Sequence, residues 1–132
     1  MAKGLILIID ESAETREMYA DCFRYHDYDV IEAADGIEGA QLFQQQRPDL
    51  IVTELSGDPQ WMRALRTIRW PTSGGRTAMI ACSTWIDRAW PSAPAGIEVD
   101  VVLPKPTLPN ELLAEAESLL ARQAYEQLRV PA

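Results

Sequence analysis

Glu54 ends an apolar stretch that has the composition of a buried β-strand. The stretch follows the Pro48-Asp49 turn and continues as Leu50-Ile51-Val52-Thr53 without a helical period, which is typical of a strand covered on both faces of a parallel sheet. Ligands bind at the carboxyl ends of the strands in an open α/β sheet. The Glu54 carboxylate is therefore a candidate ligand-binding group, although on position alone a solvent-exposed acid explains it equally well.

Four other polar residues lie at or just after the ends of predicted strands. They are Asp10, Glu11, Ser83 and Lys105. The carboxyl ends of parallel strands meet at one edge of a sheet, so we expect these side chains to converge with Glu54 in one pocket.

The pocket depends on strands and helices that alternate along the chain. The predicted strands are 5–9, 28–33, 48–55, 77–83 and 99–103, and the predicted helices run from Ser12 to about His26, 37–46, 59 to about 69, and 110 to about 129. A further helix around 85–90 is expected to be short because Pro91 and Pro94 follow it. The helical spacing places Met18 and Phe23, and later Ile37 and Phe43, on the inward faces.

This alternation predicts an α/β fold of the flavodoxin type. We expect a five-stranded parallel sheet in the order 2-1-3-4-5 with helices on both faces, a three-layer sandwich. Residues 1–132 would form a single domain, with a core over about 5–120 and an extended last helix.

Composition excludes several classes of partner. The chain has 132 residues, a formal net charge of −8 and a pI near 4.6, which argues against nucleic acid and anionic membrane surfaces. The first apolar run stops at Asp10 and is too short to span a membrane or to serve as a signal peptide. We therefore expect a cytoplasmic protein, in which Cys22 and Cys82 are buried thiols.

Five short segments carry a resemblance to a known family. They are Ile8-Ile9-Asp10-Glu11, Ala34-Asp35-Gly36-Ile37-Glu38, Pro48-Asp49-Leu50-Ile51, Ile80-Ala81-Cys82-Ser83 and Leu103-Pro104-Lys105-Pro106. In this order and spacing, the chain resembles a response-regulator receiver domain of two-component signalling over about residues 5–120.

The resemblance implies a role for each residue of the pocket. In the family, an acidic pair holds Mg²⁺, an Asp after the third strand accepts a phosphoryl group from a histidine kinase, and a Ser or Thr and a Lys bind the phosphoryl oxygens. Asp10 and Glu11 match the acidic pair, Glu54 matches the acceptor and would complete the metal ligands, and Ser83 and Lys105 match the phosphoryl-binding residues. Carboxylate oxygens suit Mg²⁺, and a lysine offsets their repulsion.

Two positions depart from the family pattern. Glu54 replaces the acceptor Asp, and its extra methylene moves the carboxylate outward by about 1.5 Å, into the space of the phosphoryl group. Because phosphoryl transfer depends on close positioning, this change argues against ordinary phosphotransfer. Val102 stands where the family has an aromatic switch residue. The resemblance also implies a cis Lys105–Pro106 peptide.

The leading hypothesis is therefore an atypical receiver, or pseudo-receiver, rather than an enzyme. It would be a stand-alone module of phosphorelay signalling that binds a protein partner, a histidine kinase or a downstream protein, without needing phosphorylation. A Glu54–Lys105 ion pair would hold one conformation, with Mg²⁺ as an optional ligand. Trp85 and Trp90 are candidates for the interaction surface, and the end of the last helix, around Tyr125 and Leu128, is a candidate for pairing with a second copy.

Three alternatives differ in chemistry. One is a working Mg²⁺-dependent receiver in which Glu54 or Asp58 is phosphorylated. Another is a flavin- or nucleotide-binding protein, but the acidic pocket repels phosphate and no glycine-rich loop follows the first strand. A phosphatase of the dehalogenase type would need two Asp separated by one residue, which Asp10-Glu11-Ser12 does not provide.

Overall fold

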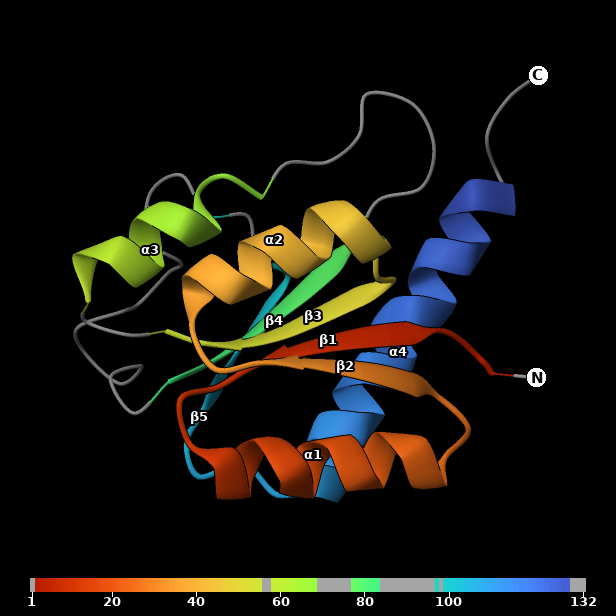
Figure 1. The fold of residues 1–132 in the computed structure, drawn as a ribbon. Helices are drawn as coiled ribbons and strands as arrows, with labels where there is room; N and C mark the ends of the chain where they lie inside the picture. Colours follow the sequence, from red (N-terminus) through yellow and green to blue (C-terminus); the bar gives the residue numbers. More distant parts are fainter. Residues whose placement is uncertain (1, 56–57, 69–76, 84–96, 98, 129–132) are drawn as a thin grey trace.

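Five parallel strands form one sheet in the order β2-β1-β3-β4-β5, with helices on both faces (Figure 1). The computed structural model describes residues 2–55, 58–68, 77–83, 97 and 99–128. The strands are β1 (Leu5–Ile9), β2 (Asp29–Ala33), β3 (Leu50–Glu54), β4 (Ala78–Ser83) and β5 (Val101–Pro104), and the helices are α1 (Ala13–Tyr25), α2 (Gly36–Gln46), α3 (Pro59–Leu65) and α4 (Pro109–Leu128). The predicted fold class and strand order are confirmed.

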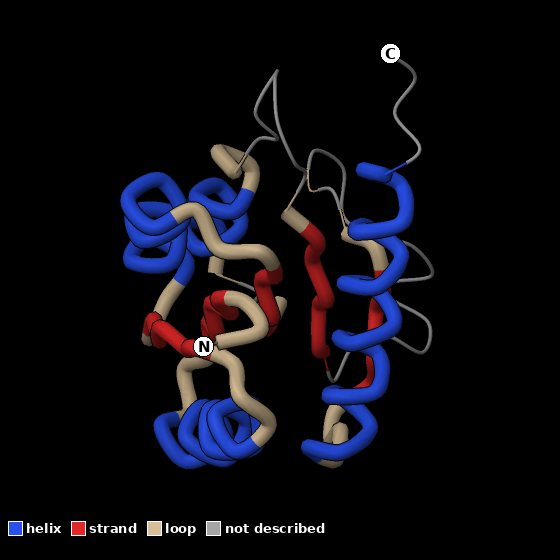
Figure 2. Tube along the Cα trace, turned by 90° about the vertical axis from the view of Figure 1, so that its right-hand side faces the viewer, coloured by secondary structure: helices blue, strands red, loops and turns tan. Residues whose placement is uncertain are grey.

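The sheet lies between two pairs of helices, α2 with α3 on one face and α1 with α4 on the other (Figure 2). Each face has its own core. Ile6, Ile8 and Phe23 belong to the core under α1 and α4, whereas Leu7 and Ile9 belong to the core under α2 and α3. Alternate residues of β1 thus face opposite cores, which is why this strand is apolar throughout.

Short side chains let α2 approach the sheet and α3 closely. A Cβ atom on Gly36 would lie 2.7 Å from the backbone oxygen of Trp61, and one on Gly39 would lie 2.3 Å from Cδ1 of Ile9. Any larger residue at these positions would collide with a neighbour. Two glycines of α2 therefore set how tightly this layer packs.

Several predicted details are wrong. Met18 and Ile37 are 44% and 47% exposed, not inward-facing. The α1 residues that pack inward are Tyr19, Ala20 and Phe23, and Met18 lies about 100° around the helix from Tyr19. Ile37 faces the space beside α3, because the glycines of α2 occupy the position against the sheet.

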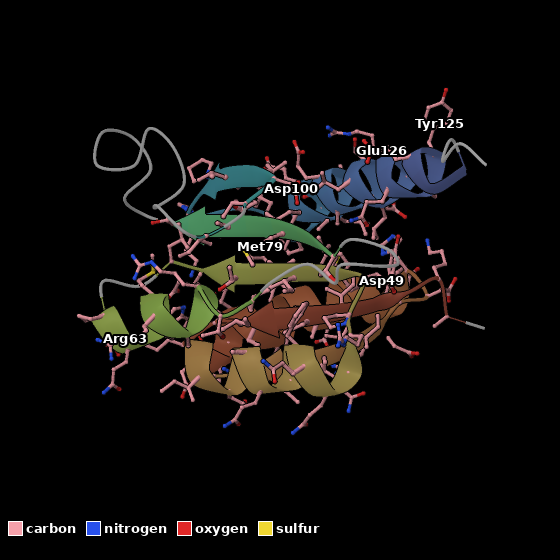
Figure 3. The ribbon with its side chains drawn as sticks, turned by 90° about the horizontal axis from the view of Figure 1, so that it is seen from above. Asp49, Arg63, Met79, Asp100, Tyr125 and Glu126 are labelled. Atoms are coloured by element: carbon pink, nitrogen blue, oxygen red, sulfur yellow. The ribbon has the colours of Figure 1, made fainter. Side chains whose placement is uncertain are left out.

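Several element boundaries also differ from the prediction by one or more residues. α3 ends at Leu65 rather than near residue 69. β5 begins at Val101 rather than Val99, because the Asp100 carboxylate accepts a hydrogen bond from the Met79 backbone N–H at 2.8 Å while the Asp100 N–H bonds to the Met79 carbonyl at 2.9 Å (Figure 3). The predicted short helix at 85–90, including Trp85 and Trp90, lies outside the described residues. Among the helices described, none is long and apolar enough to cross a membrane.

Candidate functional site

The Lys105 side chain joins two carboxylates at the carboxyl edge of the sheet. Its Nζ lies 2.9 Å from Oδ2 of Asp10 and also donates a short hydrogen bond to Oε2 of Glu54. The side chain of Lys105 is 16% exposed and that of Glu54 is 20% exposed, while that of Asp10 is only 3% exposed. Because water is largely excluded, each carboxylate depends on the ammonium group for its charge balance.

Asp10 is held in place from three directions. Its backbone N–H donates to the carbonyl of Ala33 at 3.1 Å, which continues the pairing of β1 with β2. Its Oδ1 accepts from the N–H of Ser12 at 2.8 Å, and Oδ2 accepts from Lys105. Ser12 in turn caps α1 by accepting from the N–H of Thr15. The start of α1 therefore fixes the orientation of the buried carboxylate.

Glu54 is linked to α3 through its backbone. Its carbonyl oxygen accepts hydrogen bonds from Nε1 of Trp61 at 3.1 Å and from the hydroxyl of Thr53 at 2.9 Å. The Trp61 side chain is 3% exposed, so its indole N–H needs a buried acceptor. The residue that carries the site carboxylate is thus also an anchor for α3.

Burial and the neighbouring charges shift the pKa values of Glu54 and Lys105. Burial raises the pKa of the Glu54 carboxyl; the Lys105 hydrogen bond opposes this shift, and the negative charge of Asp10 adds to it. Burial works against the charged form of Lys105, but hydrogen bonds to Asp10 and Glu54 outweigh it and raise the pKa of the ammonium group. Lys105 is therefore a firmly charged donor at neutral pH.

The loop after β5 brings Lys105 to the site. The Lys105 backbone N–H donates to the carbonyl of Ser83 at 3.0 Å, and the Lys105–Pro106 peptide is cis. The hydroxyl of Tyr19, on α1, donates to the carbonyl of Thr107 at 2.9 Å, and burial raises the pKa of Tyr19 to about 12. This loop is consequently fastened to both β4 and α1.

The remaining predicted site residues lie around this group. Ser83 is buried at the end of β4, and Val102 is half-buried on β5 opposite Ala81. The Asp58 carboxylate caps α3 by accepting from the N–H of Gln60 at 2.9 Å. Glu11 is exposed.

The carboxylates do not form a metal-binding arrangement in this conformation. Within the described ranges, no three His, Cys, Asp or Glu side chains lie where they could hold a metal ion. The oxygen donors of Asp10, Glu11 and Glu54 are of the type that Mg²⁺ prefers, but Lys105 lies on Asp10 and Glu54. A divalent cation would have to compete with that ammonium group.

Sequence reasoning did not identify Arg16 as part of the site. Its Nη1 donates to the backbone carbonyl of Asp10 at 2.7 Å, and its Nε lies 3.2 Å from Glu32 on β2. Arg24 lies beside it, with Nη2 3.4 Å from Glu32 and 3.3 Å from the Val30 carbonyl. The only signal in the sequence is an arginine in the second turn of a helix that begins next to Asp10.

Solved structures with the same arrangement define the class of fold. The chemotaxis response regulator CheY4 of Vibrio cholerae matches with a TM-score of 0.73 and 23% identity, covering 89% of this chain and 98% of that one. A CheY-like response regulator receiver domain protein of Methanospirillum hungatei matches with a TM-score of 0.75 and 19% identity, covering 92% and 97%. These similarities show a receiver-type fold.

Sequence comparison then shows the family. The profile of the response regulator receiver domain matches residues 6–117, so the chain belongs to that family, whose members act in two-component signalling. It is 31% identical to the probable transcriptional regulator ycf27 of Porphyridium aerugineum and to the response regulator MprA of a Mycobacterium species, over 92% of this chain in each case. Since these matches cover 50% and 53% of the two relatives, the chain spans about half their length.

Proposed function

We propose that this receiver domain is a pseudo-receiver: a protein-binding module, not an enzyme, that works without phosphorylation. The observation that carries the proposal is the pairing of Lys105 with both Glu54 and Asp10. Glu54 stands at the end of β3, the position that the resemblance matches to the family's acceptor Asp. Its carboxylate already has the lysine as a partner, so the ammonium group is engaged without a phosphoryl group.

The ion pairs favour one conformation of the strand ends. Lys105 follows β5, Asp10 follows β1 and Glu54 ends β3, so a single ammonium group ties three strands together. Separating any of them would leave a largely buried charge unpaired, which costs several kcal/mol. We infer that the output surface for a histidine kinase or a downstream protein is held in one state.

The test is intact mass after treatment with acetyl phosphate and Mg²⁺. We expect no mass gain for the wild-type protein, because the longer Glu54 side chain places its carboxylate about 1.5 Å too far out. The Glu54→Asp variant is the matched comparison, since it restores the family's acceptor and should gain one phosphoryl group. A gain in the wild-type protein would overturn the proposal.

The competing function is a working Mg²⁺-dependent receiver. It would require a phosphoryl group on Glu54 or on Asp58. Asp58 is less favourable because its carboxylate is used as the cap of α3. Peptide mapping of any phosphorylated product would distinguish the two, and the Asp58→Asn variant would keep the cap while removing the acceptor.

Receiver domains generally bind Mg²⁺ at their phosphorylation site. In this chain, we propose that Asp10, Glu11 and Glu54 would hold the ion only when Lys105 leaves it room. The Lys105→Ala variant should therefore bind Mg²⁺ more tightly than the wild type, measured by tryptophan fluorescence. Equal affinities would show that Lys105 does not compete with the cation.

Pairing of two copies through the end of α4 stays a prediction. Tyr125 is 60% exposed there and points outward beside Glu126 (Figure 3). Light scattering coupled to size exclusion, with Tyr125→Ser for comparison, would show whether a dimer forms through this residue.

A further inference from the structure

A shallow groove runs between α2 and α3 on the face opposite α1 and α4. Two adjoining hollows of about 340 and 300 Å³ share Ile37, Ala64 and Thr67 as lining residues. Ala40 lines the groove from α2 and Arg63 from α3. We call this feature the α2–α3 groove; none of its residues belongs to the Lys105 pocket.

The floor of the α2–α3 groove is apolar. Ile37 is 47% exposed, and Ala40 and Ala64 are half-buried beside it. Residues 37 to 44 span two turns, about 10 Å of α2, so the groove is long enough for two successive turns of a docked helix. An exposed isoleucine between small side chains is suited to contact one apolar side chain from each turn.

The rim of the groove is positively charged and amide-rich. Arg63 projects from α3 away from the sheet (Figure 3), and it makes no ion pair with any residue that the structure describes. Gln41, Gln44 and Gln60 supply the other polar groups. A cation without an ion pair beside an apolar floor, in a chain of net charge −8, favours a partner that brings a carboxylate to this place.

The groove also has a firm base. Trp61, on the buried side of α3, donates to the Glu54 carbonyl, and its backbone lies against Gly36, the residue before Ile37. The two walls are therefore held together by a buried contact rather than by surface side chains. A preformed site loses less conformational entropy on binding than one that must be ordered.

We propose that the α2–α3 groove binds an acidic amphipathic helix of a partner protein. Its apolar side chains, one turn apart, would cover Ile37, Ala40 and Ala64, and a carboxylate would pair with Arg63. This inference goes beyond the proposed function, because the groove can bind whether or not Glu54 is phosphorylated. Intact mass tests the proposed function and peptide binding tests the α2–α3 groove, so either proposal can fail without the other.

The experiment selects peptides from a phage-displayed library of random 16-residue sequences on the immobilised full chain. We expect the enriched peptides to carry Glu or Asp together with apolar residues at spacings of three or four. The tightest would then be synthesised and titrated by fluorescence anisotropy. Ile37→Lys and Arg63→Glu should each weaken binding by at least about tenfold, the loss typical of a hot-spot residue.

Matched controls make the same types of substitution on helices α1 and α4, outside the α2–α3 groove. Met18→Lys alters an exposed apolar residue on α1, and Arg122→Glu reverses an exposed charge on α4; both should leave affinity within about twofold. Because Arg63 and Ile37 are exposed, both groove variants should keep the circular dichroism spectrum of the wild-type protein. If Ile37→Lys does not keep it, Arg63→Glu alone tests the inference.

Four results would overturn the inference. One is a failure to enrich any peptide, and another is enrichment of basic or patternless peptides. The third is binding that survives both groove variants. Sedimentation showing self-association that Arg63→Glu abolishes would also overturn it, since the occupant would then be a second copy of this chain.

Discussion

Nη1 of Arg16 lies 2.7 Å from the backbone carbonyl oxygen of Asp10, so a side chain of α1 holds the residue whose carboxylate pairs with Lys105. The same guanidinium also reaches Glu32 on β2. It therefore connects the carboxyl end of β1 to the edge of the sheet, from a position that is 17% exposed.

Replacement of Arg16 by Ala should destabilise the fold. The loss of a charged donor to a buried carbonyl is expected to lower the free energy of unfolding by about 1.5 kcal/mol, measured by urea unfolding. Arg24→Ala is the control: its side chain is 48% exposed and shares Glu32, so its loss should cost no more than about 1 kcal/mol. Equal losses would mean that the Asp10 contact contributes nothing special.

Removal of the Lys105 ammonium group should be more damaging. Lys105→Met leaves Asp10 and Glu54 without their partner, and we expect a loss of about 3 kcal/mol in the free energy of unfolding at neutral pH. Adding Glu54→Gln to the Lys105→Met variant should recover part of the lost free energy of unfolding. The double-mutant cycle should therefore give a nonzero coupling energy between Lys105 and Glu54.

The exposed pair of Lys3 with Glu117, 3.2 Å apart, provides the comparison for that cycle. Lys3→Met should cost less than about 1 kcal/mol because water screens the pair. If the Lys105 and Lys3 variants were equally stable, the site would not be acting as a buried ion-pair network.

The stability contributed by Glu54 should depend on pH in a defined direction. Its pKa in the folded protein lies above the ordinary value of 4.5 because of burial, so protonation of Glu54 favours folding. That contribution is complete below the unfolded-state pKa and is lost as the pH rises through the folded-state pKa. The free energy of unfolding of Glu54→Gln, relative to the wild type, should therefore increase from about pH 4 to pH 7.

Urea unfolding at several pH values measures this trend. Glu126→Gln, on the exposed end of α4, controls for the loss of one surface carboxylate. A relative stability of Glu54→Gln that falls over the same range would mean that attraction to Lys105, not burial, dominates the titration of Glu54.

Gly36 should not tolerate a side chain. The Cβ atom of Gly36→Ala would lie 2.7 Å from the Trp61 backbone oxygen, and a backbone atom cannot rotate away as a side chain can. We expect a loss of about 2 kcal/mol in thermal or urea unfolding. Gln44→Ala, at an exposed position of the same helix, should be neutral within about 0.5 kcal/mol.

The sheet could be predicted because its strands are almost uniformly apolar. Both ends of β1, Leu5–Ile9, were predicted correctly, because its five aliphatic side chains are followed directly by the charged Asp10. The edges were less certain. β5 starts two residues late because the Asp100 side chain replaces a backbone partner at that point, and such a substitution leaves no mark in hydrophobic periodicity.

The meeting of Asp10, Glu54 and Lys105 followed from strand order, but their partners did not. Sequence spacing says which strand ends converge, whereas the bonds of Arg16 to a carbonyl and of Trp61 to Glu54 depend on side-chain direction in three dimensions. Likewise, helical periodicity predicted that Ile37 faces inward. Periodicity carries no information on how closely helices pack, and here two glycines bring another face of α2 against the sheet and α3.

Arg24 also bears on the edge of the sheet formed by β2. β2 is an edge strand, and the Ala33 carbonyl points inward to accept from the Asp10 N–H. Carbonyls alternate in direction along a strand, so that of Val30, three residues earlier, points to the open edge, where the Arg24 guanidinium already bonds to it. A strand from another molecule would meet a positive charge and an occupied acceptor, which protects this edge from pairing between molecules.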